Sequence, residues 1–322
     1  MAIIGTWNAT LTNQTGNDSI GQPTDNANES NFMVHLRVIP LFLVLCIVLG
    51  IIGNAIALWH IIRKKQFSSP TDVLLLDLII MNILIILASG IAILEIEHSF
   101  ISVQLLGFID VITNVISLYG NPAFMTCIAV DQYIAIVHPI TFHAWRKPRY
   151  YVVLSLTAWL TFLTLGVLIF FHRKGTLDNP FSCRAQVSIW ERNLVLILCT
   201  ELVVFFIPIL ILLTCYALSA KKLIEVGAGK ESMEMMKKKV LRTILAILAL
   251  LLLCFAPFHV IELSFILRNL LDSRGEIVRW YICNIRPYTW AITSLNTVLN
   301  PLLYIFRSQM FQWKTVCCSA HQ

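Results

Sequence analysis

The chain has 322 residues, of which 57% are hydrophobic and 13% are charged. Its mean hydropathy is +0.77, whereas about a quarter of the residues in a soluble domain of this size are charged. Too little polar surface is present to cover a globule in water, so the composition excludes an ordinary soluble protein. It predicts a chain that lipid covers over much of its surface.

Residues 1–32 are predicted to form a polar extracellular tail. They show no basic segment followed by a hydrophobic core, so we expect no cleavable signal peptide and an insertion signal in the first membrane helix. Four Asn-X-Ser/Thr triplets fit the glycosylation acceptor pattern, and their acceptors are Asn8, Asn13, Asn17 and Asn28. The triplets favour an outer location, and an Asn/Thr-rich disordered tail is the alternative interpretation.

Seven apolar stretches follow within residues 33–305. Each can cross a hydrocarbon layer of ~30 Å, which takes about 20 helical residues. Helices satisfy their own backbone polar groups in lipid, and the alternation typical of barrel strands is absent. The expected fold is all-α, a seven-transmembrane helix bundle. The stretches are centred near Cys46, Ile85, Val115, Trp159, Val204, Leu250 and Ala291.

Basic residues predict the orientation of this bundle. With the N-terminus outside, most of the 24 Lys and Arg residues lie on the inner side, including the runs Arg63–Lys65 and Lys237–Lys239. This asymmetry predicts a multi-pass protein of the plasma membrane with an extracellular N-terminus and a cytoplasmic C-terminus. The basic inner rim is also expected to attract anionic lipid headgroups.

Prolines interrupt three of the apolar stretches, at Pro208, Pro257 and Pro301. A proline inside a helix frees a carbonyl and bends the helix, so these are candidate hinges. In lipid the freed groups need partners, which Asn296 and Asn300 can supply. Phe255, two residues before Pro257, is placed to change its packing as the helix swings. Simple packing kinks are the alternative interpretation.

Residues 306–322 are predicted to form a short amphipathic helix and a cytoplasmic tail. Apolar and polar residues are mixed over Phe306–Trp313, which favours a helix lying on the inner leaflet. Cys317 and Cys318 follow this segment and are candidate palmitoylation sites. Two unmodified cytosolic thiols are the alternative.

Several motifs, in chain order, resemble those of the rhodopsin-like (class A) G-protein-coupled receptors over roughly residues 33–315. They are Gly53-Asn54, Asp131-Gln132-Tyr133, Trp159, Pro208 with Tyr216, Cys254-Phe255-Ala256-Pro257-Phe258-His259, and Asn296 with Asn300-Pro301-Leu302-Leu303-Tyr304. The Cys-Phe-x-Pro-x-His pattern is most similar to the purine-receptor-like branch. The resemblance implies a cell-surface receptor that transmits the binding of an extracellular ligand to a heterotrimeric G protein, with arrestin as a further candidate partner.

The resemblance also implies a set of switch and G-protein contact residues, namely Asp131, Gln132, Tyr133, Tyr216, Phe255, Pro257, Asn300, Pro301 and Tyr304. In the family, an arginine held by the neighbouring acid stands where this chain has Gln132. Glutamine keeps hydrogen-bonding capacity but loses the charge and the planar five-donor fork. Lys147 and Arg149 are candidate partners for the remaining Asp131.

Two further positions depart from the family pattern. Asn82 stands where the family usually has a buried aspartate that helps to hold a sodium ion, so we expect no strong sodium sensitivity. Gly107 stands where the family has a helix-three cysteine, which leaves Cys183 without its usual partner. We hypothesise that Cys183 pairs with Cys283, the other cysteine expected on the oxidising side.

Ionisable and polar residues in the outer halves of the helices are candidates for ligand binding, since such residues are costly in a membrane. They are Asp110, Asn114, Tyr119, Glu201, His259, Glu262, Arg286 and Trp290. Alternatively, Glu262 and Arg286 form an ion pair and His259 is a satisfied interior histidine. The resemblance disfavours a monoamine, because Asn114 replaces an aspartate, and a multiply charged nucleotide, because acids oppose Arg286. A peptide, lipid or small polar ligand with a positive group fits better.

Other function classes remain as alternatives. Gln132 leaves open an atypical receptor with weak or absent G-protein activation, which acts as a decoy, a scavenger or an arrestin-biased receptor. A transporter is a remote alternative, since the halves of the chain show no convincing repeat. Metal-ligand spacing, a nucleophile elbow and a phosphate loop are absent, so we expect no enzyme activity, cofactor or metal. Nor is a nucleic-acid partner expected.

Overall fold

The computed structural model describes residues 25–63, 71–98, 102–138, 147–174, 190–191, 193–225, 231–271 and 280–304. These residues are almost entirely helical, which confirms the predicted all-α fold. The expected amphipathic helix at 306–313, the first three glycosylation acceptors, Cys183, Cys317 and Cys318 lie outside the described residues, as does the side chain of Cys283.

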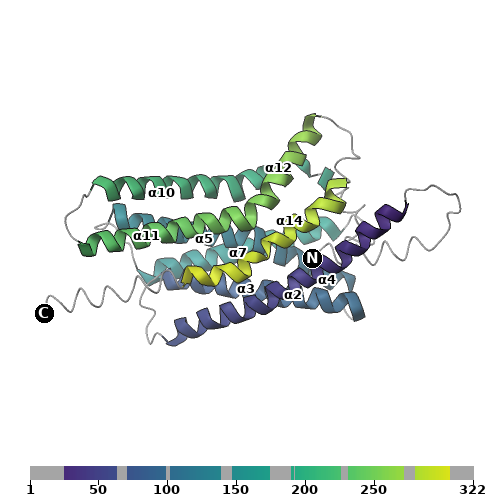
Figure 1. Cartoon of the computed structure of the whole chain (residues 1–322), viewed down its shortest axis with the longest axis horizontal. Coiled ribbons are helices and arrows are strands. Elements are labelled where there is room, and N and C mark those ends of the chain that lie inside the picture. Colours follow the sequence, from purple (N-terminus) through teal and green to yellow (C-terminus); the bar gives the residue numbers. More distant parts are fainter. Residues whose placement is uncertain are drawn as a thin grey trace.

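The helices run alongside one another as one bundle (Figure 1). Helix one is α2 (Asp25–Arg63), helix two is α3 (Thr71–His98) and helix four is α7 (Pro148–Lys174). Helix three comprises α4 (Val103–Val115), η1 (Ile116–Gly120) and α5 (Asn121–Val137). Helix five comprises α9 (Leu194–Glu201), η2 (Leu202–Phe206) and α10 (Ile207–Glu225). Helix α2 begins at Asp25 and so includes Asn28, while the extracellular location of residues 1–32 stays a prediction.

The last two transmembrane helices complete the bundle. Helix six comprises α11 (Glu231–Leu250), η3 (Leu251–Phe255) and α12 (Ala256–Leu271). Helix seven comprises η4 (Tyr281–Ile285), α14 (Arg286–Thr293) and the helical residues 295–304, with a turn at Ser294. Among the described residues, 6 helical spans are long and apolar enough to cross a membrane, and they correspond to helices one to six.

The described residues include four turns of wide π-helix, one each in helices three, five, six and seven, and each ends two residues before a proline. The prolines are Pro122, Pro208, Pro257 and Pro287. A proline lacks the backbone N–H, and its ring clashes with the carbonyl four residues earlier. That carbonyl lies inside the wide turn in all four cases, which relieves the clash without ending the helix. Figure 1 shows α12 leaning away from the line of α11 at η3.

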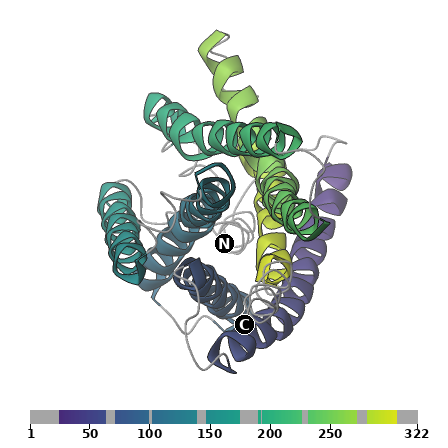
Figure 2. The same cartoon turned by 90° about the vertical axis from the view of Figure 1, so that its left-hand side faces the viewer.

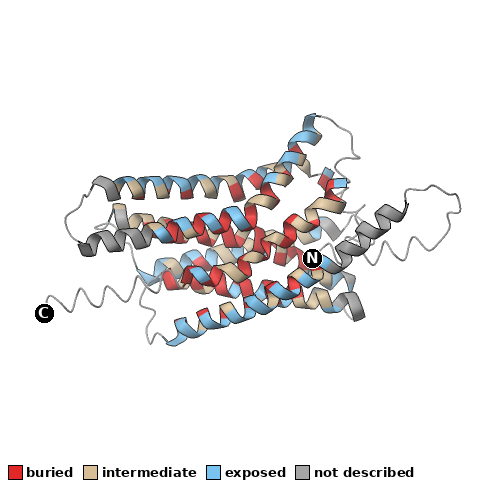
Figure 3. Ribbon diagram, in the orientation of Figure 1, coloured by how far each residue is buried: buried red, intermediate tan, exposed pale blue. Residues whose placement is uncertain are grey.

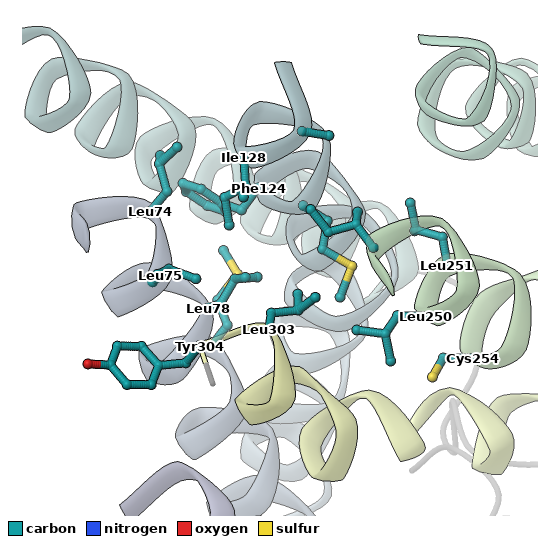
Figure 4. Packing of buried hydrophobic residues seen from close by; sticks show 14 of the residues in the cluster. Leu74, Leu75, Leu78, Phe124, Ile128, Leu250, Leu251, Cys254, Leu303 and Tyr304 are labelled. Carbon is teal, nitrogen blue, oxygen red and sulfur yellow. The ribbon is translucent and has the colours of Figure 1, made fainter. Parts of the chain in front are cut away.

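Buried residues face the interior of the bundle, and apolar residues exposed to lipid cover the outside (Figure 3). In the end-on view, α2 and α7 lie on opposite sides (Figure 2). The largest hydrophobic cluster joins α3, α5, η3 and the end of helix seven, where Leu78, Phe124, Leu251 and Leu303 pack together (Figure 4). Helix α5 packs against α3, α10 and α11, so it is the central helix of the inner half.

Helices one and seven approach closely at Pro301. A Cβ atom on Gly53 would lie 3.1 Å from Cγ of Pro301, so the absence of a side chain permits this approach. Pro301 cannot donate a hydrogen bond to the carbonyl of Thr297. Asn54 Nδ2 donates to that carbonyl at 2.8 Å, across the contact between the two helices. The expectation that Asn296 and Asn300 supply this partner is therefore wrong, since helix one supplies it.

Candidate functional site

Glu262 lies at the centre of a polar cluster at the outer end of helices six and seven. Its carboxylate is 1% exposed and accepts hydrogen bonds from Trp190 Nε1 at 2.8 Å, from the hydroxyl of Tyr281 and from Arg286 Nε at 3.1 Å. The Arg286 side chain is 29% exposed and lies 5.6 Å from the ring centre of Phe258. The interpretation of Glu262 and Arg286 as an ion pair is confirmed.

A second pair joins helices five and six. His259 Nδ1 lies 2.5 Å from Glu201 Oε2, and both side chains are buried. The imidazole stacks on the ring of Phe205, with ring centres 4.3 Å apart. Phe205 belongs to the wide turn η2, and His259 lies two residues after Pro257. The pair therefore connects the two helices next to the distorted turn of each.

Helix three contacts helix seven in the same outer half of the bundle. Trp290 Nε1 donates to Asn114 Oδ1 at 2.7 Å. Asp110 is 3% exposed and lies one helical turn before Asn114, on the same face. Tyr119 packs, with Trp290 and Phe258, into an apolar cluster beneath these polar groups. The structure thus brings seven of the eight ligand-binding candidates into contacts among helices three, five, six and seven, and it places Asp110 on the same face of helix three as Asn114.

Sequence reasoning missed two residues that hold Glu262, Trp190 and Tyr281. Both are almost fully buried and pack in an apolar cluster with Ile266 and Ile282. Trp190 lies in a polar break between helices, and Tyr281 precedes the apolar centre of helix seven. The available signal was an aromatic side chain with a polar atom beside a membrane segment, where such residues commonly lie.

At the inner end, Asp131 accepts hydrogen bonds from two hydroxyl groups. Thr71 Oγ1 of helix two lies 2.5 Å from Asp131 Oδ2, and the hydroxyl of Tyr151 of helix four donates to Oδ1. The neighbouring Gln132 is 5% exposed, and the ring of Tyr133 packs edge-on against His138. Asp131 therefore holds helix three to helices two and four. The sequence suggested Lys147 or Arg149 as its partner and did not predict these two hydroxyl donors.

A second buried acid, Asp77, joins helices two and four nearer the middle of the bundle. Asp77 Oδ1 accepts hydrogen bonds from Trp159 Nε1 and Ser155 Oγ, each at 2.9 Å. Tyr151, Ser155 and Trp159 are spaced four residues apart, so they form one stripe along helix four. Because α7 is otherwise exposed to lipid over most of its surface, this polar stripe positions it in the bundle.

The remaining switch candidates lie along the inner halves of helices five, six and seven. Phe255 is fully buried within the main cluster at the end of η3, two residues before the hinge candidate Pro257. Tyr304 packs edge-on against His60, with ring centres 5.3 Å apart. Tyr216 is partly buried in α10.

Comparison with known proteins places these features in one family. The family model described as 7 transmembrane receptor (rhodopsin family) matches residues 53–304. The human "Uracil nucleotide/cysteinyl leukotriene receptor" is 26% identical over 281 residues, which cover 84% of this chain and 73% of that protein. The rat "Somatostatin receptor type 4" is 25% identical over 282 residues, which cover 84% of this chain and 70% of that protein.

Proposed function

The chain belongs to the rhodopsin family of seven-transmembrane receptors, and on this premise we propose that it transmits the binding of an extracellular ligand to a cytoplasmic G protein. It is a multi-pass protein of the plasma membrane, and its relatives are receptors rather than enzymes. The excess of basic residues at one end of the bundle supports an extracellular N-terminus and a cytoplasmic C-terminus.

The observation that carries this proposal is the set of contacts on helix six just outside Pro257. His259 is joined to Glu201 of helix five, and Glu262 is joined to Arg286 of helix seven. Phe255, just inside the proline, is packed in the central core. A ligand that changes either pair alters how helix six is held at its outer end, and the bend at Pro257 transmits that change inward.

The charges at this site support a ligand that competes for one member of the Glu262–Arg286 pair. A cationic group competes for Glu262, and an anionic group competes for Arg286, whose side chain is the more exposed of the two. The name of one relative refers to a uracil nucleotide and a cysteinyl leukotriene, and the name of the other refers to somatostatin. A ligand screen should therefore include both cationic and anionic compounds.

The test is Glu262→Gln, measured as nucleotide exchange on purified G proteins with the receptor reconstituted in lipid vesicles. The amide keeps the shape of the side chain but loses its charge, so helix six is held less firmly and ligand-independent exchange should rise several-fold. Glu191→Gln is the matched control, since it removes the same charge from an exposed neighbour of Trp190. Exchange that stays at the vesicle background for both variants and the parent, with every G protein tried, would contradict coupling.

Gln132 supports a second candidate function, an atypical receptor that binds ligand with weak or absent G-protein activation. The side chain is buried beside Asp131 and carries no charge to present to a G protein. In this case Gln132→Arg should raise nucleotide exchange at least tenfold, whereas Gln132→Lys, which lacks the planar fork, should raise it less. An unchanged rate in Gln132→Arg would favour ordinary coupling, and arrestin recruitment measured in parallel would separate an arrestin-biased receptor from a decoy.

A further inference from the structure

Buried asparagines from four helices meet in the middle of the bundle. We call them the asparagine cluster, and its members are Asn54, Asn82, Asn121, Asn296 and Asn300. Asn82 Nδ2 donates to Asn54 Oδ1 at 3.1 Å. Asn300 Nδ2 donates to both Asn82 Oδ1 and Asn121 Oδ1, each at 3.2 Å. All members are between 0% and 5% exposed, so their amides have no access to bulk water.

The orientation of the four hydrogen-bonded amides, those of Asn54, Asn82, Asn300 and Asn121, follows from two backbone carbonyls. Asn54 Nδ2 lies 2.8 Å from the carbonyl oxygens of Gly50 and of Thr297, and a carbonyl can only accept. The Nδ2 group of Asn54 must therefore face them, which turns its Oδ1 toward Asn82. Asn82 must then present Nδ2 to that oxygen and Oδ1 to Asn300.

The same reasoning determines which amide groups of the asparagine cluster are available to bind another molecule. Asn300 uses Nδ2 for its two hydrogen bonds, and its buried Oδ1 has no hydrogen-bond partner among the described residues. Asn121 uses Oδ1 to accept, and its buried Nδ2 has no partner in the part of the chain that the structure describes. Asn296 lies one turn before Asn300, and within the described ranges neither its Nδ2 nor its Oδ1 has a partner. The cluster therefore presents amide donors and amide acceptors in equal number.

These residues do not fit the sodium ion that the family pattern associates with this position. A cation needs acceptors and a compensating negative charge, because transfer of an isolated charge into an apolar interior is very costly. Asn121 presents N–H donors, which repel a cation, and every member of the cluster is neutral. The nearest acid along helix two, Asp77, accepts its hydrogen bonds from helix four instead.

We propose that the asparagine cluster is a binding site for water, which joins Asn121, Asn296 and Asn300 and makes the middle of this bundle independent of sodium. A water molecule offers two donors and two acceptors, so it matches the mixed polarity that the amides present. Buried waters typically make about three hydrogen bonds to buried polar groups that otherwise lack partners. This inference is independent of the ligand and of G-protein coupling, since it concerns the isolated receptor.

Sodium titration of the purified receptor tests this directly, with the thermal unfolding midpoint as the readout. We expect the same midpoint in sodium, potassium and N-methyl-D-glucamine chloride at equal ionic strength. Stabilisation by sodium over potassium would overturn the proposal. This measurement needs no variant, so a variant that fails to fold does not leave the question open.

Asn82→Asp extends the test, because the carboxylate cannot donate to Asn54 Oδ1 and places two acceptors side by side. We expect a lower midpoint in N-methyl-D-glucamine and recovery specific to sodium, with an apparent sodium affinity at least about a hundredfold above that of the parent protein. Asn82→Ala is the control and should be destabilised equally in all three salts. If sodium did not stabilise Asn82→Asp more than the other cations do, the missing negative charge would not explain why sodium leaves the midpoint of the parent protein unchanged.

A high-resolution structure of the parent receptor in sodium chloride tests the identity of the guest. We expect density at hydrogen-bond distance, about 2.7–3.2 Å, from both Asn121 Nδ2 and Asn300 Oδ1. A peak with markedly shorter contacts to oxygen atoms alone would identify a cation and overturn the proposal. A site without density between these two atoms would overturn it as well.

Discussion

Replacement of Asn54 by leucine isolates the contact between helices one and seven. Leucine preserves the approximate volume of the side chain but removes the donor to the Thr297 carbonyl and the acceptor for Asn82 Nδ2. Each buried polar group left without a partner costs about 1–3 kcal/mol. We therefore expect Asn54→Leu to lower the free energy of unfolding by ~2–6 kcal/mol, measured by chemical denaturation in micelles.

The second half of this prediction is a rescue by Pro301→Ala. Alanine restores the backbone N–H at position 301, which can donate to the same Thr297 carbonyl as in an ordinary helix. The cost of Asn54→Leu should then fall by about 1–3 kcal/mol in the Pro301→Ala background. Pro208→Ala is the matched control, since its freed carbonyl lies in helix five. Additive effects of Asn54→Leu and Pro301→Ala would refute the assignment of Asn54 as the partner of that carbonyl.

Two further predictions concern the acids that hold helix four. Tyr151→Phe removes one hydroxyl donor from Asp131 and should lower the free energy of unfolding by about 1.5–3 kcal/mol, measured by denaturation, with Arg149→Gln as an exposed control; an unchanged stability would contradict the contact. Trp159→Phe removes the N–H donor to Asp77 Oδ1 and should destabilise more than Ser155→Ala, because it also loses buried aromatic surface. The reverse order in thermal unfolding midpoints would count against a central role for Trp159.

The architecture could be predicted from the sequence because membrane burial leaves a strong pattern. Apolar length and basic asymmetry are properties of whole segments, so they predict the helices and their order without any tertiary contact. Pro208 and Pro257 could also be predicted as hinges, because each interrupts an apolar stretch of the sequence. Pro122 and Pro287 were not singled out, although the structure places a wide turn before each of them.

The partners of the polar groups could not be predicted in the same way. Glu262 and Arg286 could be interpreted either as ligand-binding residues or as an ion pair, because each interpretation places charged residues at the outer ends of helices. Asp131 with Tyr151, and Asp77 with Trp159, depend on which faces of helices two, three and four meet. The rotation of each helix about its axis decides those faces, and spacing along one helix does not fix it.

The four wide turns carry a consequence for chain length. A π turn holds about one residue more than an α turn, and one residue rotates everything beyond it by about 100° around the helix axis. In helices three, five and six, a one-residue surplus therefore sets the rotation of the outer half independently of the inner half, whereas η4 lies at the outer end of the described part of helix seven. Removal of a single residue from Leu251–Phe255 would leave α11 in place and present a different face of α12, with His259 and Glu262 turned away from their partners. In helices three, five and six the count of residues, as much as their identity, specifies which side chains the outer half of each helix presents.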